Sequence, residues 1–183
     1  MFAVLAGTAA AGLAAGWLVW GRAPSPAVVV AEFLEDRCLP YVTDGSLNVA
    51  GLTSISLAGT PAFAEEDRAV SVSFMERSGI WRCHISDTLA LWTAEESAAV
   101  FAAVEAFATD HVAPMNDGAL VRHDATSEGV GDPQVVWRRP TKELGFFVMF
   151  VRHRFPEHQR ITSVSFGQSE FIRPVDDPEA SDV

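Results

Sequence analysis

The sequence lacks the short motifs that assign a chemistry to a chain. It has no G-x-x-x-x-G-K-[ST], H-E-x-x-H, C-x-x-C or G-x-S-x-G pattern. Gly129 and Gly131 are not followed by the third glycine of a dinucleotide-binding loop, and they lie in a polar stretch, so they predict a turn. We therefore expect no catalytic residue, no metal ligand and no bound cofactor.

Basic residues are scarce. The 183 residues include 13 Lys and Arg against 24 Asp and Glu, which gives a formal net charge of −11. Such a chain repels a phosphate backbone, so we expect no nucleic-acid partner. The basic residues gather in residues 138–173, where Arg138, Arg139 and Arg154 are candidates for binding an anionic ligand or an acidic protein partner. The alternative is that these arginines pair with the acidic half of the same fold.

Charge is absent from the start of the chain. Residues 2–21 carry no charged side chain and are about long enough to span a bilayer. Residues 1–23 are therefore predicted to be a signal peptide or a transmembrane anchor, which would hold the protein to the membrane through residues 1–21 if it stays uncleaved. Ser25-Pro26-Ala27 fits the small-residue cleavage rule. We expect the body in the periplasm or on the extracytoplasmic face of the membrane. No basic residue precedes the apolar run, so the membrane orientation stays open.

Cysteine is limited to Cys38 and Cys83, the smallest even number that an exported protein can pair. Cys38 continues the apolar stripe of a predicted helix. Cys83 lies between Trp81 and Ile85 on the apolar side of a predicted strand. A helix packed on that side of the sheet would bring the two thiols together, so we predict a disulfide. Two separate buried thiols are the alternative, and a cytoplasmic body would have them.

The hydrophobic periodicity predicts two main helices. One covers residues 27–39 and ends at Pro40, and the other begins at Thr93, where Glu96 completes a capping box. Alternating residues at 69–76 and 80–87 predict a β-hairpin with one wet face. Further strands are indicated at residues 53–57, 134–138, 144–151 and 161–166.

Together these elements predict an α+β fold. Its order is α-β-β-α-β-β-β, with an antiparallel sheet of about five strands, two main helices packed on one face, and a hydrophobic N-terminal helix. Residues 24–173 are predicted to form a single domain. Residues 174–183, which carry 4 acidic and no basic residues, are predicted to be a disordered acidic tail. No internal repeat is expected.

Two other groups of residues contain the residue types of catalytic or metal sites. Cys83 and His84 are neighbours on a strand, so their side chains point to opposite faces and cannot form a thiol–base pair. His84 is expected in solvent beside Arg82. His153, Glu157 and His158 match no ligand spacing of a helix or hairpin and predict a surface loop.

These observations favour an exported or membrane-anchored envelope protein that acts as a non-enzymatic binding or accessory domain. A membrane-tethered assembly factor that acts through its N-terminal helix is one alternative. An enzyme with an unrecognised site is the other.

Overall fold

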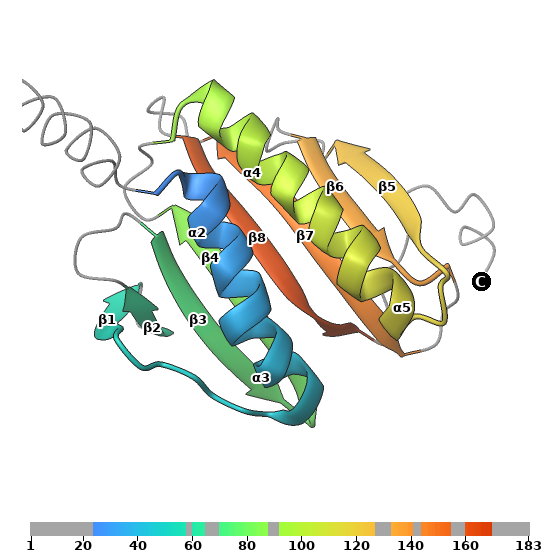
Figure 1. Cartoon of the computed structure of the whole chain (residues 1–183), viewed down its shortest axis with the longest axis horizontal. Coiled ribbons are helices and arrows are strands. Elements are labelled where there is room, and N and C mark those ends of the chain that lie inside the picture. Colours follow the sequence, from blue (N-terminus) through green and yellow to red (C-terminus); the bar gives the residue numbers. More distant parts are fainter. Residues whose placement is uncertain are drawn as a thin grey trace, which may run out of the picture.

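Two helical segments lie side by side across one face of an antiparallel sheet (Figure 1), which confirms the predicted α+β class. The computed structural model describes residues 24–57, 60–64, 70–87, 92–126, 133–140, 144–154 and 160–169. The hydrophobic segment at residues 1–23 and the acidic tail at residues 174–183 lie outside the described residues, so both stay predictions. Among the described helices, none has the length and apolarity needed to cross a membrane.

The described residues form a sheet of eight strands in the order β1-β2-β3-β4-β8-β7-β6-β5, and each neighbouring pair is antiparallel. The strands are β1 (Thr53–Leu57), β2 (Thr60–Ala64), β3 (Val70–Arg77), β4 (Ile80–Asp87), β5 (Val121–Thr126), β6 (Pro133–Arg138), β7 (Gly145–Arg154) and β8 (Arg160–Ser169).

The prediction of about five strands was wrong. β1 was expected as a strand at its observed bounds, residues 53–57, although the predicted order did not include it, whereas β2 and β5 were not predicted. The sequences of β2 and β5 are TPAFA and VRHDAT. They carry few large apolar residues because they lie at or next to the edges of the sheet, where strands have less apolar surface to bury. Alternation of apolar residues therefore did not reveal them.

The helical segments are longer than predicted. The first comprises α2 (Pro26–Phe33), a π-helical turn η1 (Leu34–Cys38) and α3 (Leu39–Asp44). The second comprises α4 (Ala94–Phe107), a π-helical turn η2 (Ala108–Val112) and α5 (Ala113–Met115). The predicted capping box is confirmed, because Glu96 N–H donates to Thr93 Oγ1 at 3.1 Å and Thr93 N–H donates to Glu96 Oε2 at 2.8 Å.

Pro40 does not end the first helix. A proline inside an α-helix lacks the N–H that would donate to the carbonyl of residue i−4, and its ring clashes with that carbonyl. The π turn avoids this conflict, since the Leu39 N–H bonds the Leu34 carbonyl, five residues back. The second helix repeats the device, with the Ala113 N–H on the Ala108 carbonyl directly before Pro114. The predicted end at Pro40 was wrong because the wider turn accommodates the proline.

The chain folds as two similar halves, each a helical segment followed by four antiparallel strands. Both segments carry the pattern V-x-x-F-x-x-D-x-x-x-P, beginning at Val30 and at Val104, and both end near an Asp-Gly pair. Gly45 and Gly118 in those pairs share a left-handed φ of 79°. The last strands of the two halves, β4 and β8, pair at the centre of the sheet. The prediction of no internal repeat was therefore wrong.

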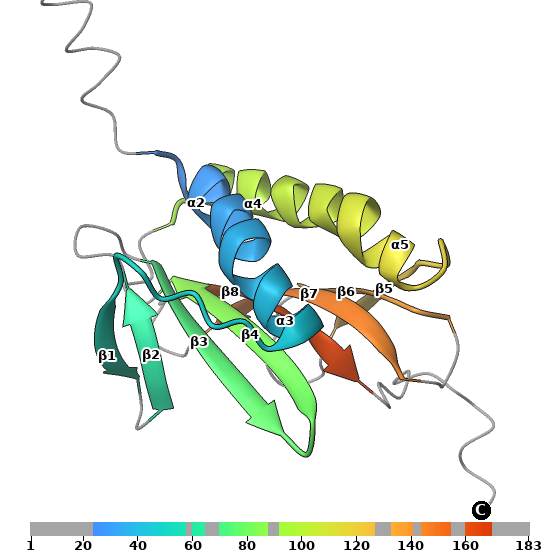
Figure 2. The ribbon, with the colours of Figure 1, turned by 60° about the horizontal axis from the view of Figure 1, so that its bottom comes forward.

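The core lies between the helices and the sheet (Figure 2). Both helical segments turn a valine and a phenylalanine of the shared pattern onto the central strands, where these side chains are buried. Phe107 meets Phe166 of β8 edge to face, with ring centroids 5.1 Å apart. Such packing stabilises the fold by burial and by ring geometry together.

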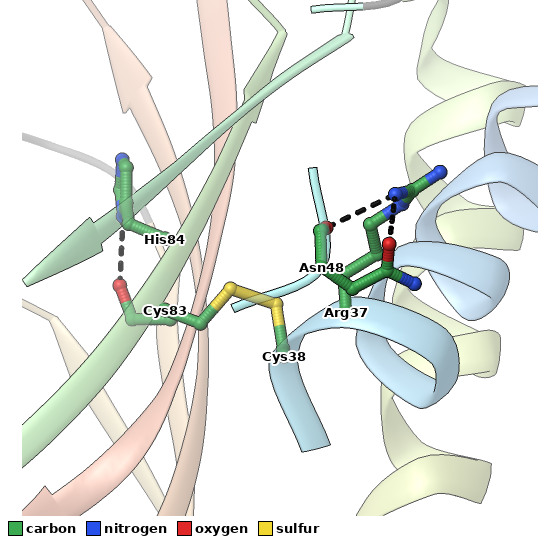
Figure 3. Close-up of a disulfide and its surroundings, with 6 residues drawn as sticks. Arg37, Cys38, Asn48, Cys83 and His84 are labelled. Atoms are coloured by element: carbon green, nitrogen blue, oxygen red, sulfur yellow. Dashed lines mark hydrogen bonds between the residues drawn. A yellow bond between two sulfur atoms is a disulfide. The ribbon is translucent and has the colours of Figure 1, made fainter. Parts of the chain in front are cut away.

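The predicted disulfide is confirmed. Cys38, the last residue of η1, bonds Cys83 in β4, and their Cα atoms are 5.3 Å apart (Figure 3). Both cysteines are fully buried. His84 points to the other side of β4 in the same figure, as the strand geometry predicted. The bond thereby fastens the first helix to the central strand.

Removing the disulfide is expected to destabilise the protein without changing its fold. The bond spans a sequence separation of 45, for which the loss of unfolded-state entropy is worth about 4 kcal/mol at most. Chemical denaturation of the oxidised protein and of a Cys38→Ala, Cys83→Ala variant measures this difference. An unchanged free energy of unfolding would contradict the stabilising role.

Candidate functional site

The sheet face opposite the helices, which we call the open face, carries an unusual set of side chains. Successive strand residues alternate between the two faces, so the registers of the eight strands define the open face directly. Among its described side chains there is no Asp or Glu, although the chain has 24 of them. Its charged or titratable described residues are Arg77, Arg82, Arg138, His84 and His123.

Two cross-strand rows cross the open face. The first runs Met75, Arg82, Gly167, Phe147, Arg138, Val121 from β3 to β5. The second runs Ser73, His84, Ser165, Met149, Val136, His123 over the same strands. Both rows combine cationic or polar donors with apolar side chains.

Arg82 is held across the central strands. Gly167 stands opposite it on β8, and a Cβ there would lie 2.7 Å from Arg82 Cγ and 2.8 Å from the Trp81 carbonyl oxygen. The absence of a side chain lets Arg82 extend over β8, so that its Cζ lies 5.7 Å from the centroid of the Phe147 ring. This cation–π contact places the guanidinium in the middle of the first row.

The structure separates the three arginines that the sequence grouped. Arg138 belongs to the open face, next to Phe147, and its Nη1 donates to the Arg139 carbonyl at 3.3 Å. Arg139 follows the end of β6 and pairs with Asp117 at 3.0 Å. The backbone of Arg154 pairs with Arg160 at the opposite end of β7, and its side chain lies outside the described ones. Of the three, Arg138 alone shares a row with Arg82.

Arg82 and Arg138 differ from Arg122 and Arg139 in their partners. Arg122 and Arg139 each face a carboxylate, at 2.9 Å from Glu105 and 3.0 Å from Asp117 respectively. Neither Arg82 nor Arg138 forms an ion pair with any described carboxylate. Two such guanidinium groups on one face have N–H donors of the kind that carboxylates and phosphates accept.

The second row contains two half-buried histidines. His84 Nδ1 lies 2.9 Å from Ser165 Oγ, and His84 is half-buried. The prediction that His84 lies in solvent was therefore wrong. Burial, and then the charge of Arg138, lower the pKa of His123, while Asp124 opposes the shift. His123 is thus electrostatically coupled to Arg138 in the neighbouring row.

Serine hydroxyls line the open face beside these rows. Ser71 and Ser86 lie 3.1 Å apart across β3 and β4, and Ser71, Ser73 and Ser163 are buried. The hairpin of β3 and β4 therefore has no fully wet face, which corrects the prediction from alternation. Its predicted turn is confirmed, with Ser78 and Gly79 both at positive φ.

The atom types of His84 and Ser165 are those of a base and a nucleophile. Catalytic pairs of this kind also need a group that orients the imidazole, usually a carboxylate. The described part of the open face supplies no carboxylate, and the bond joins the two central strands, β4 and β8. Likewise, the described residues contain no group of three His, Cys, Asp or Glu that could hold a metal ion.

Comparison with known proteins found no matching family model, no matching curated protein and no matching solved structure. The proposed function therefore rests on the residues of the open face.

Gly167→Ala is expected to displace Arg82 from Phe147 and to lower the free energy of unfolding by roughly 1–3 kcal/mol, a typical cost of overpacking. Adding Arg82→Ala should recover part of this loss, because it removes the atom nearest to the new methyl group. Chemical denaturation of the single and double variants provides the measurement. Ser56→Ala, at an exposed position of β1, is the control. Equal stabilities of Gly167→Ala and this control would rule out the close approach.

Proposed function

We propose that this protein is an extracytoplasmic, non-enzymatic binding domain whose open face takes an anionic ligand. The observation that carries the proposal is the pair Arg82 and Arg138. They share one cross-strand row on a face whose described side chains include no carboxylate, and no described carboxylate neutralises either of them. Guanidinium groups in such a setting form strong charge-assisted hydrogen bonds with carboxylates and phosphates.

The geometry of the open face also supports a role in binding a ligand. The polar groups of the open face are spread along strands of a sheet, and strands hold side chains more rigidly than loops do. Phe147 under Arg82 keeps that guanidinium extended before a ligand arrives, so less side-chain entropy is lost on binding. These features favour recognition of a ligand.

The extracytoplasmic location draws support from the disulfide. Such bonds persist in oxidising compartments and are rare in the cytosol. The disulfide between Cys38 and Cys83 is compatible with export by residues 1–23, whether these act as a cleaved signal or as an anchor. In the anchored form the binding domain would work at the membrane, as the proposed assembly factor would.

Anion binding is expected to depend on Arg82 and Arg138. A double Arg82→Gln, Arg138→Gln variant should bind citrate and inorganic phosphate at least about tenfold more weakly, which corresponds to about 1.4 kcal/mol. The full oxidised chain in an uncharged maltoside detergent is titrated by NMR, with the amide shifts of β4, β6 and β7 as the signal.

The matched control is Arg37→Gln with Arg122→Gln, which changes the net charge equally on the helix side of the sheet. Surface charges contribute little to stability, so both variants should keep the fold, as circular dichroism can verify. Equal weakening in the control and the test variant would attribute binding to net charge and would refute a site on the open face.

Export is tested independently of binding. Alkaline phosphatase fused after Pro24, ahead of the first helix, is expected to be active in a suitable bacterium, because the enzyme needs an oxidising compartment to form its own disulfides. A cytoplasmic reporter at the same junction serves as the control. If the reporter is active and the phosphatase is not, the proposed location is wrong.

A further inference from the structure

The first row of the open face presents two positive charges to one small area. Three strand spacings, about 14 Å in all, separate the Cα atoms of Arg82 and Arg138. Arg82 covers much of that span, because its Cζ is already 5.7 Å from the centroid of Phe147. Phe147 is in turn the direct cross-strand neighbour of Arg138. One compact group between the two side chains can therefore meet both guanidinium groups.

The second guanidinium is also placed in advance. Arg138 Nη1 bonds the Arg139 carbonyl, and Arg139 is fixed in turn by Asp117. Arg139 also packs against Gly145, where an added Cβ would come within 3.0 Å of Arg139 Cβ. A guanidinium has five N–H donors, so Arg138 keeps donors for a ligand after it makes the bond to the backbone.

Charge and shape then select the ligand. A carboxylate or another monoanion satisfies one positive charge and leaves the second guanidinium without a counter-ion beside the buried Phe147. A phosphate monoester carries about −1.5 to −2 charges at pH 7 and three acceptor oxygens, enough for two guanidinium forks. The neighbouring row adds the His123 imidazole near Arg138.

Larger phosphate-bearing partners fit less well. A nucleic acid would be repelled by the net charge of −11. An anionic bilayer gains only about 1 kcal/mol for each basic residue near its surface, and the open face offers three described arginines and no described lysine. A small soluble ligand avoids most of this repulsion, since it meets the local pair alone.

We propose that the open face binds the doubly charged phosphate group of a small, soluble phosphate monoester, held between the guanidinium groups of Arg82 and Arg138. This inference rests on the proposed function and names its ligand class.

The test compares two probes that differ in charge and share a tetrahedral head. Ethyl phosphate is largely dianionic at pH 7.5, because the second pKa of a phosphate monoester is about 6, and ethanesulfonate is a monoanion. Titration of the full oxidised chain in maltoside detergent, followed by NMR, should show ethyl phosphate binding at least about tenfold more tightly. Arg82→Gln and Arg138→Gln, made singly, should each abolish that preference, because one guanidinium then remains.

His123 supplies a second signal. Saturation with ethyl phosphate is expected to raise the pKa of His123, since the bound dianion offsets the charge of Arg138. Arg138→Gln should raise the same pKa without any ligand, which also shows that the variant is folded around His123. A His123→Gln variant assigns the resonance.

The outcomes separate the two proposals. Ethanesulfonate binding within about twofold of ethyl phosphate, with both dependent on the arginines, overturns the monoester inference and leaves anion binding in place. Failure of ethyl phosphate, ethanesulfonate and citrate to shift the open face overturns both. Phosphatidic acid vesicles that bind with the same dependence on the arginines while ethyl phosphate does not would overturn the soluble ligand.

Discussion

The pairing of β4 with β8 is the contact on which the rest of the structure depends. It joins the last strand of one half to the last strand of the other, so that two four-stranded units become one sheet and both helices meet above the join. An unpaired β4 or β8 would be an exposed edge open to wrong partners. Cys83 lies in this pair opposite Phe166, and its disulfide ties the first helix to the same place. The open face exists because the halves combine in this way.

Local chemistry made part of the fold predictable. Alternation predicted the hairpin of β3 and β4, and the capping pattern predicted the capping box at Thr93; both depend on residues close in the sequence. The disulfide followed from the number of cysteines and from their place on the buried side of a helix and a strand. The continuation of the helix through Pro40 was missed, because the rule that proline ends a helix assumes α-helical bonds to residue i−4. The repeated V-x-x-F-x-x-D-x-x-x-P pattern was visible in the sequence, and with the Asp-Gly pairs it could have revealed the two halves.

The site was less predictable because it is assembled across strands. Alternation alone put Arg82 and His84 on one face. Their partners Gly167, Ser165 and Phe147 come from the other half of the chain, with His84 and Ser165 separated by 81 positions, and no local signal sets that register. Arg138 and Arg139 are neighbours in sequence, yet one joins the open face and the other pairs with Asp117 at the end of β6. Clustering of charge along the chain was therefore a poor guide to clustering in space.

The proposed anion site lies in a protein of net charge −11, so the distance over which the acidic residues repel an anion matters. At physiological ionic strength charges more than about 8 Å apart are largely screened. The acidic residues beyond that distance then oppose an approaching anion weakly, while groups in direct contact decide the binding. The described open face has guanidinium, imidazole and hydroxyl groups within the two rows and no carboxylate among them. An extended anion would come close to more of the acidic residues than a small one does. We therefore expect the proposed site to favour a small ligand over an extended one.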